Sequence, residues 1–222
     1  MFFGHTHYDQ FQLHYSDYSA RTAANALVTS YLAPSLTPTS GQPAFRVYTV
    51  DPVTFAVLDT TTYTADMDDP AFQTTGPVWK KYYSAKEAYG AALNPPVTDP
   101  AAELTAAFWH NVTVAFESDP ALYGQYVARK RRGWKIDTCT GDCARLDVCA
   151  IRAGRAQDNC DVPTPGIHFN KRAENLYEER DECGISVARA SLGSVVVRRD
   201  VLEHLARRFV EEGALVDGEA VY

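Results

Sequence analysis

Several common features are missing from this sequence of 222 residues, and each absence narrows the class of protein. No uncharged apolar stretch approaches the roughly 20 residues that a membrane-spanning helix needs. The first residues have neither the basic region nor the long apolar run of a secretory signal, so no signal peptide is expected. Positive charge is in deficit, with Lys+Arg 21 against Asp+Glu 28 and a net charge of −7. That balance argues against a dedicated nucleic-acid-binding protein or a polybasic membrane anchor.

The sequence nevertheless has enough apolar material for a buried core. Hydrophobic residues make up 45% and aromatic residues 12% of the chain, which favours a folded protein over a disordered one. Charge is distributed unevenly, and residues 161–222 form a highly charged segment, with 8 basic and 12 acidic side chains. This change in composition predicts a boundary near residue 161.

Cysteine is absent from the first 138 residues, and all five cysteines lie between Cys139 and Cys183. Cys139, Cys143, Cys149 and Cys160 fall within 22 positions, and two disulfides among four cysteines allow about three connectivities. One helical turn would bring the Cα atoms of Cys139 and Cys143 to about 6 Å, which a disulfide can bridge. A zinc site or buried thiols are the alternatives, although the spacing lacks paired zinc-ligand motifs at both ends. Disulfides are favoured, and they would imply an oxidising compartment.

Hydrophobic periodicity and capping signals predict strands first and helices second, an α+β arrangement. Alternating or β-branched segments indicate the strands, and Asp-Pro pairs at 99–100 and 119–120 indicate helix starts. The expected strands are Phe11 to Tyr15, 25–32, 45–50 and 55–63, and the expected helices are 78–89, 99–117, 119–133, 143–155 and 200–213.

Other polar residues receive mainly structural interpretations. The sequon at Asn111 lies at the edge of an apolar helical stripe, so its glycosylation stays open. His14 and His110 are expected to be surface or structural residues rather than catalytic ones. The basic run Arg129–Arg132 favours a solvated helix end, with lipid-headgroup contact as the alternative. The aromatic residues of 79–89 favour core positions over a choline-binding cage.

Only Gly4-His5-Thr6-His7 has the pattern of a chemical site. In an extended segment, residues i and i+2 point the same way with Cα atoms about 6.6 Å apart. Two imidazoles placed in this way can each reach one ion of a metal pair spaced ~3.5–4 Å. The short string alone is weak evidence, since two histidines near a flexible terminus would look the same.

The surrounding sequence resembles the acid sphingomyelinase branch of the calcineurin-like metallophosphoesterases. The segment from Phe2 to Phe11 resembles the last metal-binding motif of that family, and the resemblance continues in order to about residue 160. The downstream motifs are Tyr31-Leu32-Ala33-Pro34-Ser35, Phe45-Arg46-Val47-Tyr48, Tyr82 to Gly90, Trp109-His110-Asn111, and Cys139-x3-Cys143-Ala144-Arg145-Leu146-x2-Cys149 closed by Cys160.

This resemblance implies a fold, a cofactor and an activity. Residues 1–65 would be the C-terminal strands of the metallophosphoesterase β-sandwich, and 66–160 a mostly helical, disulfide-stapled C-terminal domain. His5 and His7 match the histidines that ligate the two zinc ions, one ion each. Two disulfides are implied, Cys139 with Cys143 and Cys149 with Cys160. Family members hydrolyse sphingomyelin to ceramide and phosphocholine or cleave related phosphodiesters, as secreted or lysosome-like enzymes with possible peripheral membrane contact.

The departures from the family pattern are equally informative. The Asp-x-His, Gly-Asp, Asn-His and further His motifs that supply the other metal ligands are missing from the sequence, so the chain is expected to be a C-terminal fragment without phosphodiesterase activity of its own. The alternatives are a fragment acting on a non-lipid phosphodiester and a non-enzymatic module that binds a partner or a membrane surface. Segment 161–222 resembles nothing in the family, so Cys183, His168 and His204 receive no role.

Overall fold

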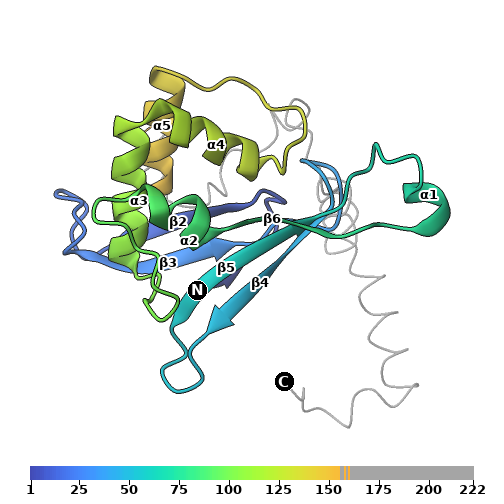
Figure 1. Ribbon diagram of the computed structural model, residues 1–222. Helices are drawn as coiled ribbons and strands as arrows, with labels where there is room; N and C mark the ends of the chain where they lie inside the picture. The colour runs from blue at the N-terminus through green and yellow to red at the C-terminus, as the bar shows by residue number, and fades with distance from the viewer. Residues whose placement is uncertain (156–157, 159, 161–222) are drawn as a thin grey trace, which may run out of the picture. The chain divides into compact units, whose positions relative to one another are not determined.

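Two small sheets and a group of helices make up the fold in the computed structural model, which describes residues 1–155, 158 and 160 (Figure 1). The first sheet has the order β1-β3-β2, and the second has the order β4-β5-β6. The strands are β1 (Phe2–Phe3), β2 (Gln10–Tyr15), β3 (Ala26–Leu32), β4 (Ala44–Val50), β5 (Val57–Thr64) and β6 (Lys80–Ser84). The helices are α1 (Phe72–Thr75), α2 (Ala85–Ala88), the 3-10 helix η1 (Gly90–Ala92), α3 (Ala106–Ser118), α4 (Pro120–Lys130) and α5 (Asp142–Ile151).

The expected α+β class is confirmed, and four of the strands lie where the sequence pattern predicts them. Strand β2 alternates between half-buried and buried residues, so Phe11, Leu13 and Tyr15 share the face that the helices cover. Strands β2 and β3 pair antiparallel, and β1 adds in parallel on the other side of β3. In Figure 1, α3, α4 and α5 gather on one side of the first sheet, whereas α1 lies on the long connection from β5 to β6.

The core between β2, β3 and α3 is largely aromatic. The rings of Phe11 and Trp109 lie 4.4 Å apart, and the Trp109 indole N–H donates a hydrogen bond of 2.9 Å to the Tyr31 hydroxyl. That hydroxyl in turn donates to the Leu104 carbonyl at 3.2 Å. The polar groups of Trp109 and Tyr31 therefore both have partners, which large amphipathic rings generally need in a core.

Two expected helices differ from the structure. The segment expected as a helix over 78–89 contains strand β6 instead, because Lys80–Ser84 pairs antiparallel with β5 and only Ala85–Ala88 is helical. The helix expected from Asp99 begins instead at Ala106. The Asp99 carboxylate accepts from the Ala101 amide at 2.9 Å in a turn, and the Thr105 hydroxyl caps α3 by accepting from the Phe108 amide at 3.0 Å.

The other helix starts agree with the capping signals. Asp119 caps α4 by accepting from the amides of Ala121 and Leu122, and Pro120 occupies its first turn. Helix α5 covers most of the stretch expected over 143–155. The helix expected over 200–213 and the proposed boundary at 161 lie outside the described residues. No helix in the described part of the chain is long and apolar enough to cross a bilayer.

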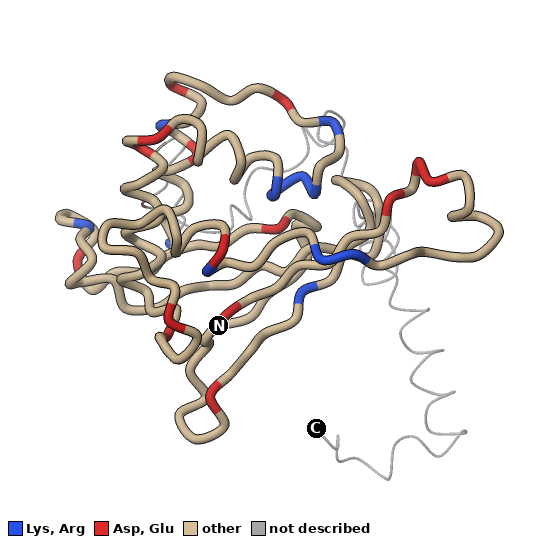
Figure 2. Tube along the Cα trace, viewed as in Figure 1, with Lys and Arg blue, Asp and Glu red and all other residues tan. Residues whose placement is uncertain are grey.

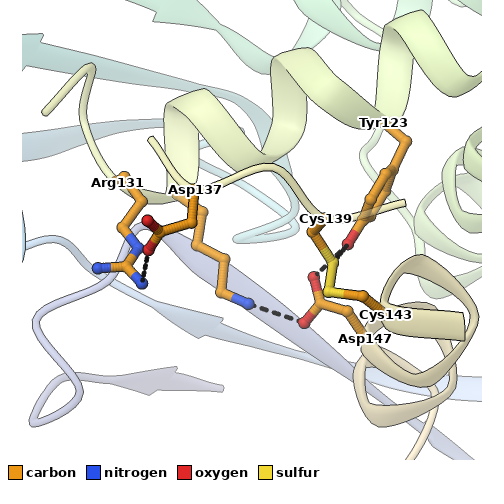
Figure 3. Close-up of a disulfide and its surroundings, with 7 residues drawn as sticks. Tyr123, Arg131, Asp137, Cys139, Cys143 and Asp147 are labelled. Atoms are coloured by element: carbon orange, nitrogen blue, oxygen red, sulfur yellow. Dashed lines mark hydrogen bonds and ion pairs between the residues drawn. A yellow bond between two sulfur atoms is a disulfide. The ribbon is translucent and has the colours of Figure 1, made fainter. Parts of the chain in front are cut away.

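Both disulfides join the cysteines as the family resemblance implies, Cys139 with Cys143 and Cys149 with Cys160. The zinc and free-thiol alternatives for these four cysteines are therefore wrong. Polar contacts join α4 and α5 beside the first disulfide (Figure 3). The Asp147 carboxylate accepts from the Tyr123 hydroxyl at 3.0 Å and from the Lys130 ammonium at 2.7 Å. These contacts hold α4 and α5 together.

His110 gives the fold a pH dependence. Its side chain is buried on α3, and its Nδ1 lies 2.8 Å from the Tyr15 hydroxyl. Burial, followed by the charge of Arg152, lowers the pKa of His110, and burial raises the pKa of Tyr15 to about 12. The structural interpretation of His110 is confirmed, because the folded state holds this imidazole neutral within the core.

We predict that the free energy of unfolding falls as the pH drops below about 6.5, because the unfolded chain then takes up the proton that folded His110 resists. Burial also lowers the pKa of His14, which acts in the same direction. Urea denaturation at several pH values measures how the free energy of unfolding changes with pH. His110→Gln should reduce this change, and His14→Gln should remove only the part that His14 contributes. An unchanged pH dependence in His110→Gln would contradict the assignment.

Candidate metal centre and its surroundings

His5 and His7 lie in the loop that leads from β1 to β2, so the sheet fixes the loop at both ends. Both residues have left-handed backbones, with φ of +84° and +62°. The extended geometry expected for this segment is therefore wrong, and so is the side-by-side spacing calculated from it. A left-handed conformation costs a non-glycine residue about 1–3 kcal/mol, and such residues concentrate at functional sites where the surroundings hold them.

Arg132 is the main residue that holds this loop. It is 1% exposed and follows the end of α4. Its guanidinium donates to the His7 carbonyl, and its Nε donates to the Gln42 carbonyl at 2.6 Å. Burial lowers the pKa of Arg132, and the charge of Asp9 acts in the opposite direction. The expectation that the whole run Arg129–Arg132 is a solvated helix end is therefore wrong for its last member.

Two further hydrogen bonds orient the side chains of the loop. The Nδ1 of His7 lies 2.7 Å from the Thr39 hydroxyl, and the Gln10 amide donates to the Thr6 hydroxyl at 3.1 Å. A polar partner on one ring nitrogen fixes the orientation and tautomer of an imidazole, as in most metal-binding histidines. Thr39 belongs to the loop after β3, so two separate segments determine how His7 points.

Asp9 anchors the same loop to the second sheet. Its carboxylate is buried and pairs with Arg46 of β4, while the hydroxyls of Thr62 on β5 and Tyr83 on β6 donate to it at 2.8 and 2.9 Å. Its amide donates to the Lys130 carbonyl at 3.1 Å. Burial is the largest single influence and would lower the pKa of Arg46, but the interactions with Asp9, Tyr83 and Tyr48 together outweigh it and raise the pKa.

The two histidines do not by themselves complete a metal site. Across residues 1–155, 158 and 160, no group of three or more His, Cys, Asp or Glu side chains is arranged to hold a metal ion. Zinc sites use about three or four protein ligands. His5 and His7 thus have the donor chemistry that zinc prefers, but a complete site needs ligands from outside the described residues.

The remaining polar residues of interest are placed as follows. The Nε2 of His14 lies 2.8 Å from the Ser30 hydroxyl on the neighbouring strand, which agrees with a structural role. The Asn111 side chain is exposed on α3. Sequence patterns did not predict the roles of Arg132 and Thr39, because Arg132 ends a basic run that favoured a solvated helix end and Thr39 belongs to no motif. Their roles depend on contacts 125 and 32 residues away along the chain.

Comparison with known proteins identifies the wider group. No family model matches the sequence. The chain is 31% identical over 161 residues to the sphingomyelin phosphodiesterase of Homo sapiens, covering 70% of this chain and 24% of that protein. It is 30% identical over 168 residues to sphingomyelin phosphodiesterase 1 of Caenorhabditis elegans, covering 73% and 27%. It is also 26% identical over 161 residues to the human acid sphingomyelinase-like phosphodiesterase 3b, covering 68% and 32%.

The fold and these matches define the class. The described residues form an α+β unit in which two disulfides staple the helical part. The chain belongs to the acid sphingomyelinase-like family of phosphodiesterases, and the matches fall in the C-terminal part of the relatives. It spans about a quarter of the length of the human and first nematode sphingomyelin phosphodiesterases.

We predict that Asp9→Ala lowers the free energy of unfolding by about 3–5 kcal/mol, because it leaves the buried Arg46 charge without its partner. Chemical denaturation monitored by circular dichroism measures the change. The matched control is Lys81→Ala, which removes an ion pair with Glu87 whose side chains are 45% and 65% exposed. We expect no measurable effect there. Equal losses in the two variants would show that burial of the Asp9 pair is not the cause.

Proposed function

We propose that this chain is the C-terminal part of a zinc-dependent phosphodiesterase that hydrolyses sphingomyelin to ceramide and phosphocholine. The similarity to several sphingomyelin phosphodiesterases supports the proposal most directly. The histidine pair adds chemical support, because His5 and His7 are imidazole donors on a loop held by hydrogen bonds to Thr39 and Arg132. Bound zinc would polarise the phosphodiester and supply an activated water.

In this proposal the residues of the chain hold and orient the metal ligands rather than complete the reaction. His5 and His7 would contribute one imidazole each, Thr39 would keep the His7 ring in place, and Arg132 would hold the His7 backbone. We propose that the 222-residue chain lacks hydrolytic activity by itself, because the described residues offer two ligands where zinc needs more.

The covalent cross-links support a location for the enzyme. Two disulfides persist in oxidising compartments and are rare in the cytosol. We therefore propose that the enzyme passes through the secretory route to the cell exterior or a lysosome-like compartment. The exposed side chain of Asn111 could carry an N-linked glycan acquired on that route.

Zinc titration of the purified chain tests the ligand assignment. The double variant His5→Ala/His7→Ala should abolish the binding seen by calorimetry, and Thr39→Val should weaken it by about tenfold. His14→Gln is the matched control, because its side chain bonds to Ser30 rather than to this loop. Zinc binding that survives the double variant unchanged would contradict the assignment.

A chimera tests the reaction. Residues 1–160 would replace the matching C-terminal part of the human sphingomyelin phosphodiesterase, with hydrolysis of sphingomyelin and of a bis-nucleotide ester as readouts. We expect zinc-dependent cleavage of sphingomyelin that His5→Ala/His7→Ala abolishes, and no cleavage by the 222-residue chain alone. A folded chimera that cleaves only the nucleotide ester would contradict the lipid substrate, and turnover by the isolated chain would contradict the incomplete site.

A further inference from the structure

An apolar groove lies beside the loop that carries the two histidines. Two segments form it, the loop over 33–43 that follows β3 and the connection over 65–79 from β5 to β6. Its volume is about 420 Å³, within the range of roughly 300–1,000 Å³ that is typical of small-molecule sites. The apolar lining consists of Leu36, Pro38, Pro43, Met67, Phe72, Pro77 and Trp79.

The groove leaves apolar side chains in contact with solvent. Leu36 is 62% exposed and Trp79 is 36% exposed, and Val78 beside the groove is 55% exposed. Trp79 is nevertheless fixed, because its ring packs edge-on against Phe45 of β4 at 5.0 Å, and Phe45 stacks on Tyr63 at 5.3 Å. A rigid aromatic wall with exposed apolar neighbours is typical of a surface that binds an apolar ligand.

Hydrogen bonds connect the two walls of the groove to each other. The Gln42 side chain donates to the Asp66 carboxylate at 3.3 Å and accepts from the Met67 amide at 3.0 Å. The Gln42 carbonyl accepts from Arg132, the residue that also donates to the His7 carbonyl. Gly41 permits this close contact, because a Cβ there would meet the Arg131 carbonyl oxygen at 2.1 Å.

One wall of the groove is therefore hydrogen-bonded to the loop that carries the two histidines. Arg132 bonds to both loops, and Thr39, which lies in the loop that forms one wall, bonds to the His7 ring. A ligand whose polar group reaches the histidines could place an attached apolar group in the groove. This geometry matches a lipid, which has a polar phosphodiester next to hydrocarbon.

Charge beside the groove restricts the headgroup. Asp66 and Asp68 flank Met67, and Asp69 follows them in the connection from β5 to α1, along which Figure 2 shows acidic segments. Carboxylates at this position repel an anionic headgroup and tolerate a zwitterionic one with a cationic end. The combination favours a phosphocholine lipid over a lipid phosphate or sulfate.

We propose that this groove binds one hydrocarbon chain of a phosphocholine lipid and so sets the orientation of the substrate at the histidine loop. The identity of the lipid as substrate rests on the proposed function. Binding of the hydrocarbon chain needs neither zinc nor hydrolysis, so the groove can be tested on the purified 222-residue protein in the absence of metal.

A brominated alkyl phosphocholine, kept below its micelle concentration, is the probe. Bromine quenches a nearby tryptophan, and of the three tryptophans Trp79 lines the groove whereas Trp109 is 3% exposed. We expect saturable quenching that Trp79→Phe removes. Phosphocholine without a chain should not compete, and the same chain with a sulfate headgroup should bind several-fold more weakly.

Charge substitutions locate the binding surface. Phe72→Glu and Met67→Glu should each weaken binding of the alkyl phosphocholine by about tenfold or more, because its bound hydrocarbon chain would desolvate the new carboxylate. The control is Phe55→Glu, at a 78% exposed phenylalanine in the turn between β4 and β5. That turn follows the Val50 end of β4, whereas the groove adjoins the Ala44 end, so binding should not change. Circular dichroism checks that each variant is folded.

Three results would overturn the groove assignment. They are quenching that persists in Trp79→Phe, equal loss of binding in Phe55→Glu and Phe72→Glu, and preference for the sulfate headgroup. Failure of the proposed function gives a different pattern, because a chimera without sphingomyelin hydrolysis would leave quenching of Trp79 intact. Loss of quenching with normal zinc binding and hydrolysis would reject the groove alone.

Discussion

The structure depends on one buried carboxylate, that of Asp9. It lies just before β2 in the first sheet and contacts each strand of the second sheet through Arg46, Thr62 and Tyr83. Its amide adds a bond to the end of α4 at Lys130. A buried charge is costly unless it is paired and hydrogen-bonded, and Asp9 has both kinds of partner. Two sheets of three strands each are thereby joined through a polar contact.

The same contact determines where the histidine loop lies. Asp9 is two residues beyond His7, so the loop is fixed by Asp9 on one side and by β1 on the other. Arg132 then holds the His7 backbone in its left-handed conformation and bonds to the loop that forms one wall of the apolar groove. A charged residue that is 1% exposed at a helix end therefore joins the two parts of the site.

Sequence patterns predicted what depends on local physics. Alternation placed β2, the Asp-Pro pair placed the start of α4, and the family resemblance implied both disulfides. Strand β6 was expected as a helix because aromatic residues at 82, 83 and 89 fit helical spacing. Pairing with β5 decides its conformation, and pairing is not visible in the local sequence.

The site was harder to predict than the fold, for the same reason. The histidine motif was recognised, but its backbone conformation depends on Arg132, which lies 125 residues away. Asp99 carries an Asp-Pro signal like that of Asp119, yet it caps only a turn, because the chain continues extended and the Leu104 amide donates to the Val57 carbonyl at 2.8 Å. Long-range hydrogen bonds override capping signals at such positions.

A double-mutant cycle on Asp9 and Arg46 tests the central claim most directly. The measurement is the free energy of unfolding of the wild type, Asp9→Ala, Arg46→Met and the double variant. The account predicts that the double variant is less destabilised than the sum of the single variants, by about 0.5–3 kcal/mol, because no uncompensated charge remains buried. Strictly additive losses would contradict the claim that this pair joins the two sheets.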